Sequence, residues 1–109
     1  MTVEQICKEL SLSIEVEGDM QQIISGGYTG DLLSWVMSRA QSGDAWITVM
    51  GNVNAVAVCV LADCACMILA EGSRLDEEAK KKAQQNGVAV LLSDLPAFRL
   101  SYQIGRLLS

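Results

Sequence analysis

The chain has 109 residues, the usual size of one domain, and is too short for a second domain. Half of its residues are hydrophobic and only 19% are charged, below the roughly 25% typical of soluble chains, so the composition excludes intrinsic disorder. The net charge of −5 argues against binding of nucleic acid, and the absence of histidine excludes histidine-based catalysis. We expect a single domain, residues 1–109, with apolar surface that a second subunit covers.

No segment has the pattern of a secretion signal or a membrane span. Residues 1–5 include an acid and lack an apolar core, and the longest apolar run, residues 55–70, is interrupted by Asp63. That run also falls short of the roughly 20 residues that a spanning helix needs. Four cysteines on a chain with a good core do not indicate a disulfide scaffold. We therefore expect a cytoplasmic protein that binds no membrane.

The first forty residues alternate between helical and extended patterns. Thr2 and Gln5 have the spacing of a capping box, which predicts the start of a helix. Further along, apolar and polar residues alternate as in a half-buried strand. The predicted segments are a helix at 2–10, a strand at 12–17, a short extended segment at 20–25, a loop with three glycines at 26–30 and a helix at 31–40.

The rest of the chain repeats a strand followed by a helix three times. The strands are almost continuously apolar, as a parallel sheet covered on both faces requires. The predicted strands are at 45–49, 65–70 and 88–92, and the helices at 53–61, 76–86 and 96–108. The expected fold is α/β, a small open three-layer domain with a mostly parallel sheet flanked by helices.

The last two helices differ in character. The helix at 76–86 has acids in its first turn followed by three lysines, so we expect Glu77 to pair with Lys81, and Glu78 with Lys82, on a solvated face. The final helix has two apolar sides, one of which is a candidate contact with a partner subunit. These sides consist of Leu95, Phe98 and Tyr102, and of Leu100, Ile104 and Leu107.

Ligands of open parallel sheets bind beyond the carboxyl ends of the strands, where loops lead into helix N-termini. Four segments qualify here, at residues 25–31, 50–54, 71–74 and 93–94. The first is the most distinctive, because paired glycines permit close approach of a phosphate. A tight turn in which Thr29 or Asp31 caps the following helix is nevertheless the favoured explanation. The candidate ligand-binding residues are Gly26, Gly27, Thr29, Gly30, Asp31, Gly51, Asn52, Asn54 and Gly72.

Catalytic and metal-binding patterns are weak. The glycine spacing fits neither a Walker A loop nor the dinucleotide fingerprint. Cys59, Cys64 and Cys66 do not have the paired spacing of structural zinc sites, so we expect no metal and no cofactor. The only clustered polar candidates for catalysis are Ser25, Thr29 and Asp31, and we do not expect an enzyme.

The chain resembles the DRTGG domain family over nearly its whole length. The resemblance lies in residues 51–53, 68–72 and 88–93 and in Phe98, and residues 26–34 are similar to short stand-alone members. The family is named for a Gly-Asp-Arg signature after one strand and a Thr-Gly-Gly signature after the next. Of these, only Gly51 and Gly72 remain here, since Asn52-Val53 stands in place of Asp-Arg and Ala70-Glu71 in place of Thr-Gly.

The resemblance implies a regulatory or accessory module. Family members occur beside CBS domains, are dimeric where the arrangement is known, and resemble the N-terminal domain of HPr kinase/phosphorylase, whose catalytic P-loop lies in a different domain. The leading hypothesis is a non-enzymatic module that homodimerises and binds a small ligand or a protein partner. The alternative is an adenine-nucleotide sensor that uses the loops at 26–31 and 51–54.

Overall fold

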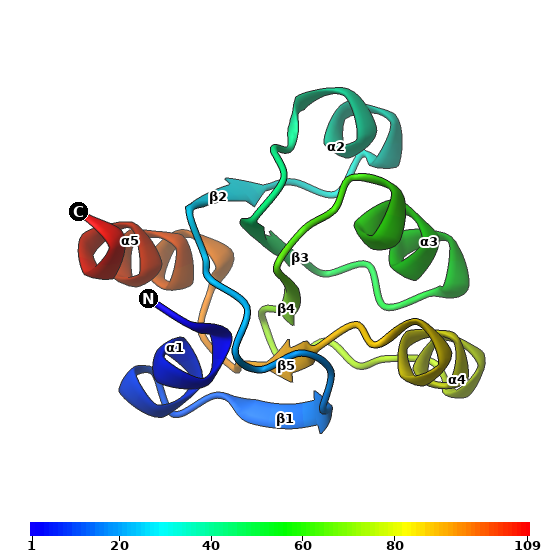
Figure 1. The fold of residues 1–109 in the computed structure, drawn as a ribbon, viewed down its shortest axis with the longest axis horizontal. Helices are drawn as coiled ribbons and strands as arrows, with labels where there is room; N and C mark the ends of the chain where they lie inside the picture. The colour runs from blue at the N-terminus through cyan, green and yellow to red at the C-terminus, as the bar shows by residue number, and fades with distance from the viewer.

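The structure, a computed structural model of residues 1–109, is built on a five-stranded sheet in the order β1-β5-β4-β3-β2 (Figure 1). Four neighbouring strands run parallel, and β1 pairs antiparallel with β5 at one edge. The strands are β1 (Ser13–Val16), β2 (Gly26–Thr29), β3 (Asp44–Thr48), β4 (Cys66–Leu69) and β5 (Val90–Leu92). This confirms the expected α/β fold with a mostly parallel sheet.

Helices cover both faces of the sheet and make three layers (Figure 1). Each parallel crossover contains one helix, and the steady order of the strands places all three crossover helices on one face. None of the five helices is both long and apolar enough to cross a membrane. One face carries α2 (Leu33–Arg39), α3 (Val53–Leu61) and α4 (Glu77–Asn86), and the other carries α1 (Val3–Glu9) and α5 (Ala97–Leu108).

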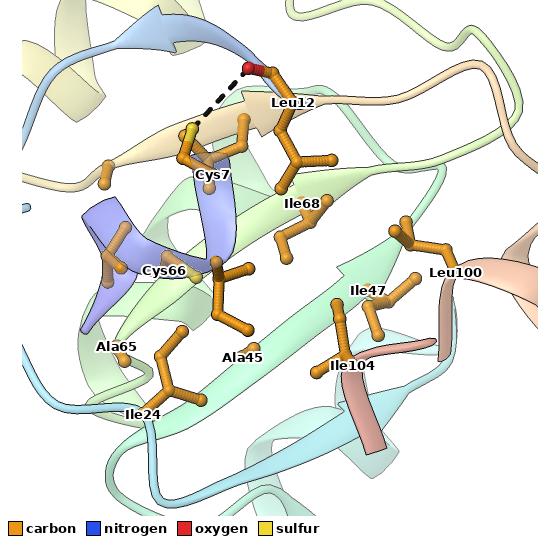
Figure 2. Close-up of a cluster of buried hydrophobic side chains, with 14 of the residues drawn as sticks. Cys7, Leu12, Ile24, Ala45, Ile47, Ala65, Cys66, Ile68, Leu100 and Ile104 are labelled. Atoms are coloured by element: carbon orange, nitrogen blue, oxygen red, sulfur yellow. Dashed lines mark hydrogen bonds between the residues drawn. The ribbon is translucent and has the colours of Figure 1, made fainter. Parts of the chain in front are cut away.

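The central strands explain the unbroken apolar runs in the sequence. All residues of β3 and β4 are buried, and alternate side chains enter opposite cores. Ile47 and Ile68 point toward α1 and α5, as Figure 2 shows, whereas Trp46 and Met67 belong to the core under α2, α3 and α4. Each face of the sheet is therefore closed by its own apolar cluster.

The predicted helices and four of the predicted strands agree with the structure to within two residues at each end. The prediction of a loop at residues 26–30 is wrong. Residues Gly26–Thr29 form β2, the outer strand, which pairs in parallel with β3 from Gly26 opposite Asp44 to Thr29 opposite Ile47. The extended segment expected at 20–25 makes only an isolated bridge between Thr2 and Ile23.

The glycines of β2 reflect close packing rather than a turn. A Cβ on Gly26 would lie 2.8 Å from Oδ1 of Asp44, a buried residue whose other carboxylate oxygen, Oδ2, accepts a hydrogen bond from the N–H of Gln41 at 2.8 Å. The side chain of Asp44 thus occupies the space that a larger residue at position 26 would need. Glycine spacing alone does not distinguish this cause from a loop.

The expected ion pairs within α4 are not formed. Lys80 instead reaches Glu15 on β1 at 3.1 Å and joins the helix to the antiparallel edge strand. Gly87 ends α4 in the left-handed conformation, with a φ of 67°, as expected for a C′ glycine. The charge run on this helix therefore serves one long-range contact and a solvated surface.

Candidate functional site

The parallel direction of β2 to β5 places their carboxyl ends along one edge of the sheet. The loops that follow β4 and β5 enclose a pocket of about 410 Å³ at this edge, which we call the carboxyl-edge pocket. Gly72 and the side chains of Leu10, Leu92 and Leu95 form part of its wall. Its polar lining consists of Ser11, Ser13, Ser73, Arg74, Ser93 and Asp94.

Backbone hydrogen bonds between the two loops hold the pocket in shape. The N–H of Glu71 donates to the carbonyl of Leu95 at 2.9 Å, and the N–H of Gly72 donates to the carbonyl of Ser93 at 3.0 Å. Glu71 and Gly72 are both left-handed, with φ of 62° and 71°. Because two consecutive left-handed residues turn the chain sharply, the segment after β4 folds back against the segment after β5.

The pocket offers a cation and several donors to a ligand. Arg74 is exposed and makes no ion pair, and the backbone N–H groups of Arg74 and Asp94 have no acceptor within the chain. The Asp94 carboxylate lies on the same wall, with Oδ1 3.3 Å from the place a Cβ on Gly72 would occupy. The pocket can thus bind an anionic group at Arg74 and a hydroxyl or amino group at Asp94.

The two serines of these loops are already engaged. The Ser73 hydroxyl donates to the carbonyl of Ala70 at 2.6 Å, and the Ser93 hydroxyl accepts from the N–H of Leu95 at 3.1 Å. Neither hydroxyl is bonded to a base. Their role in this structure is to fix the turns that carry Arg74 and Asp94.

The first candidate segment does not reach this pocket. Gly26 and Gly27 lie at the amino end of β2, at the edge of the sheet opposite the pocket, so the expected phosphate cradle is not formed by them. Thr29 shares a hydrogen bond of 2.7 Å with the hydroxyl of Ser101 on α5. The carbonyl of Gly30 accepts from Nε1 of the buried Trp46 at 2.9 Å. These residues attach β2 to its neighbours.

Asp31 caps a strand rather than a helix. Its Oδ1 accepts from the hydroxyl of Thr48 at 2.7 Å and from the N–H of Val49 at 3.0 Å, at the end of β3. The N-cap position of α2 falls on Leu32, which makes no side-chain bond. The expectation that Thr29 or Asp31 caps the helix is therefore wrong. The Thr48 hydroxyl and the Val49 N–H bind the Asp31 carboxylate instead, and the Thr29 hydroxyl is bonded to Ser101.

The second candidate segment supports the pocket from behind. A Cβ on Gly51 would lie 2.0 Å from the carbonyl oxygen of Arg74, and the N–H of Asp76 donates to the carbonyl of Gly51 at 2.8 Å. Asn52 caps α3 through the N–H of Ala55 at 2.9 Å, and Asn54 is exposed on that helix. Of the nine candidates, only Gly72 lines the carboxyl-edge pocket, and Gly51 fixes the backbone of Arg74.

Several lining residues were outside the candidate set. Arg74, Ser93 and Asp94 belong to the loops at 71–74 and 93–94, which the predicted strands place at this edge of the sheet. The glycine pattern at 26–30 instead favoured a different segment as the binding site. Ser13 enters the pocket because β1 runs antiparallel, which puts Ser13 opposite Leu92 at the carboxyl end of β5. No local sequence pattern predicts that β1 pairs antiparallel with β5. The Cys, Asp and Glu side chains nowhere form a group of three suited to hold a metal.

Compared by sequence, the chain matches no protein-family profile and no curated protein. The structural comparison supports the fold, since the helices and strands are arranged as in an α/β domain that has been solved before. The solved structure behind this is the CBS and DRTGG domains of the regulatory region of Clostridium perfringens pyrophosphatase, complexed with its activator diadenosine tetraphosphate. The TM-score is 0.74 at 16% identity, over 94% of this chain and 45% of that chain. At this identity the likeness shows the fold alone, and the chain spans less than half of the protein it resembles.

Proposed function

We propose that this protein is a non-enzymatic regulatory domain that binds a small anionic ligand in the carboxyl-edge pocket. The observation that carries the proposal is Arg74, a cation without an ion pair, beside two unpaired backbone N–H groups in a preformed pocket. Pockets at this edge are the usual ligand sites of open α/β sheets. Gly72 gives the ligand close access to the backbone, because it has no side chain.

Adenine nucleotides are the first ligands to test. Arg74 and the free N–H groups suit a phosphate, and the Asp94 carboxylate suits the hydroxyls of a ribose or an exocyclic amino group. The similar pyrophosphatase region was solved with an adenine-containing activator, which supports the same ligand class here. The nucleotide-sensing hypothesis therefore moves from the loops at 26–31 and 51–54 to the loops at 71–74 and 93–94.

The absence of catalytic activity is part of the proposal. The hydroxyls of Ser73 and Ser93 are bonded to the backbone rather than to a base. The carboxylate of Glu71, in the same loop as Arg74, accepts from the N–H of Ala97 at 3.1 Å. A nucleophile needs an adjacent base to be activated, and these contacts supply none.

We further propose that two copies associate through α5. Phe98 is 84% exposed and Tyr102 57% exposed on its outer side, the side that the sequence pattern offered for a partner. Residues 95–109 contain two arginines and no acid, while α1 alongside carries Glu9 and a Glu4 that is paired with Lys8 at 3.8 Å. A two-fold arrangement that brings the arginines of one copy to Glu9 of the other would match these charges.

Thermal unfolding in the presence of AMP, ATP or diadenosine tetraphosphate tests the ligand proposal. A ligand at 100 times its Kd adds about 2.7 kcal/mol to the unfolding free energy, and we expect Arg74→Gln to abolish the shift. Lys81→Gln is the matched control, because Lys81 is an exposed cation on α4 away from the pocket. Equal shifts for both variants would contradict the assignment to this pocket.

Sedimentation tests the association separately. We expect the wild-type protein to sediment as a dimer at micromolar concentration and Phe98→Asp to sediment as a monomer with an unchanged circular dichroism spectrum. A wild-type monomer throughout that range would contradict the dimer and leave the ligand site unaffected.

A further inference from the structure

The turn between α3 and β4 brings two cysteine side chains together. The N–H of Cys64 donates to the carbonyl of Cys59 at 3.1 Å, and the N–H of Asp63 donates to the carbonyl of Val60 at 3.1 Å. Asp63 between them is left-handed, with a φ of 58°. These features define a Schellman motif, in which the third residue from the helix end contacts the second residue beyond the cap. Here the two residues in contact are Cys59 and Cys64.

The two thiols lie on one turn and line one pocket, and they are not equivalent. The hydrogen bond from Cys59 lowers the pKa of Cys64, and it outweighs burial and the nearby carboxylates of Asp44 and Asp63, which act in the opposite direction. The same bond, together with burial, raises the pKa of Cys59 well above its ordinary value. Cys59 therefore keeps its proton and donates it, and Cys64 is the sulfur that more readily becomes a thiolate.

A small reagent can reach this pair. Cys64 is only half-buried, and with Cys59 it lines a pocket of about 140 Å³ formed with Asp63, Asn86 and Gly87. The pocket lies at the amino ends of β4 and β5, at the edge opposite the carboxyl-edge pocket. Its volume exceeds that of a single water, whose share of the liquid is about 30 Å³, so a peroxide fits.

The other two cysteines are shielded. Cys66 is fully buried, and burial raises its pKa to about 12. Cys7 lies on the buried side of α1, burial raises its pKa, and its Sγ donates to the carbonyl of Leu12 at 3.6 Å, the dashed line in Figure 2. Because the thiolate is the reactive form, these two residues are the natural internal controls.

We propose that Cys64 and Cys59 form a redox pair that a small peroxide oxidises to an intramolecular disulfide. The Cys64 thiolate attacks one oxygen of hydrogen peroxide, the O–O bond breaks, and the departing hydroxide takes up a proton to leave as water. The sulfur of Cys59 loses its proton and attacks the resulting sulfenic acid. The S–S bond forms, the S–O bond breaks, and the hydroxide that leaves takes up that proton as a second water. The two thiols are oxidised, and one peroxide is reduced to two waters.

Thiol counting after oxidation tests the pair. The reduced protein is treated with hydrogen peroxide, unfolded, and assayed for free thiols and intact mass. We expect the wild type to fall from four thiols to two, with the loss of two hydrogens in mass. Cys64→Ala keeps all its thiols under the same treatment, whereas Cys59→Ala stops at a sulfenic acid that dimedone captures on Cys64. The controls Cys7→Ala and Cys66→Ala each still lose two.

Proteolysis locates the bond. Cleavage before Asp63 separates Cys59 from Cys64 but leaves Cys64 and Cys66 in one peptide. In both the wild type and Cys66→Ala, we expect the two peptides to remain joined until the disulfide is reduced. A wild type that keeps four thiols would overturn the proposal, and so would a bond confined to the peptide that holds Cys64 and Cys66.

Discussion

Replacing Gly51 with alanine puts a methyl group into the backbone of the neighbouring loop. The new Cβ would lie 2.0 Å from the carbonyl oxygen of Arg74, 2.9 Å from its carbonyl carbon and 3.1 Å from Cα of Leu75. All three atoms belong to backbone, so no side chain can rotate away. The loop after β4 must move, and the hydrogen bond from the N–H of Asp76 to the carbonyl of Gly51 is strained or lost.

Overpacking of this kind costs about 1–3 kcal/mol, and a lost backbone hydrogen bond adds about 1 kcal/mol. Alanine also reduces the entropy of the unfolded chain, which returns about 0.4–1 kcal/mol. We therefore expect a net loss of about 1–3 kcal/mol in the unfolding free energy. Each kcal/mol lowers the thermal midpoint by roughly 4–8 °C in a domain near this size.

Urea and thermal unfolding, followed by circular dichroism, measure the loss. Gly105→Ala is the control, since a Cβ on Gly105 of α5 meets nothing within 4 Å. The control should gain about 0.5–1 kcal/mol, because alanine replaces glycine inside a helix. A Gly51→Ala protein as stable as the wild type would refute the contact between the two loops, and with it the support behind Arg74.

Three further predictions concern other parts of the structure. Asp31→Ala leaves the Thr48 hydroxyl and the Val49 N–H without their acceptor. Urea unfolding should show that the unfolding free energy falls by about 1–3 kcal/mol. An unchanged urea midpoint would contradict this. Gly87→Ala forces alanine to a φ of 67° and should lower the unfolding free energy by about 1 kcal/mol. Thermal unfolding midpoints equal to the wild type would show that alanine ends α4 equally well. Because the bond from Cys59 lowers the pKa of Cys64, iodoacetamide should label Cys64 at a lower pH than an ordinary thiol, and Cys59→Ala should move that pH profile upward. An identical profile in the variant would show that the two thiols are independent.

The repeat of strand and helix in the second half of the chain could be predicted from the sequence, because each element carries a local sequence signal. The unbroken apolar runs of β3 and β4 reflect burial on both faces, and Gly87 ends α4 by its own backbone preference. These signals place the parallel strands and hence the edge where we propose that a ligand binds. The position of the edge was therefore predictable from sequence.

The composition of the pocket was not readable in the same way, because it depends on pairings between distant segments. Gly26 is a glycine because Asp44 occupies the adjacent space, a cause that its own neighbours do not reveal. Ser13 lines the pocket only because β1 runs antiparallel to β5. The backbone hydrogen bond from Cys64 to Cys59 depends on the left-handed Asp63, and this conformation is far more common for glycine than for aspartate. In each case tertiary packing decided between local alternatives.

Backbone amide chemical shifts of the labelled protein, followed during titration with diadenosine tetraphosphate or ATP, test the central claim most directly. The proposed pocket predicts saturable shifts at Gly72, Ser73, Arg74 and Asp94, which disappear in Arg74→Gln. No shift with either nucleotide, or shifts confined to residues 26–31, would contradict it.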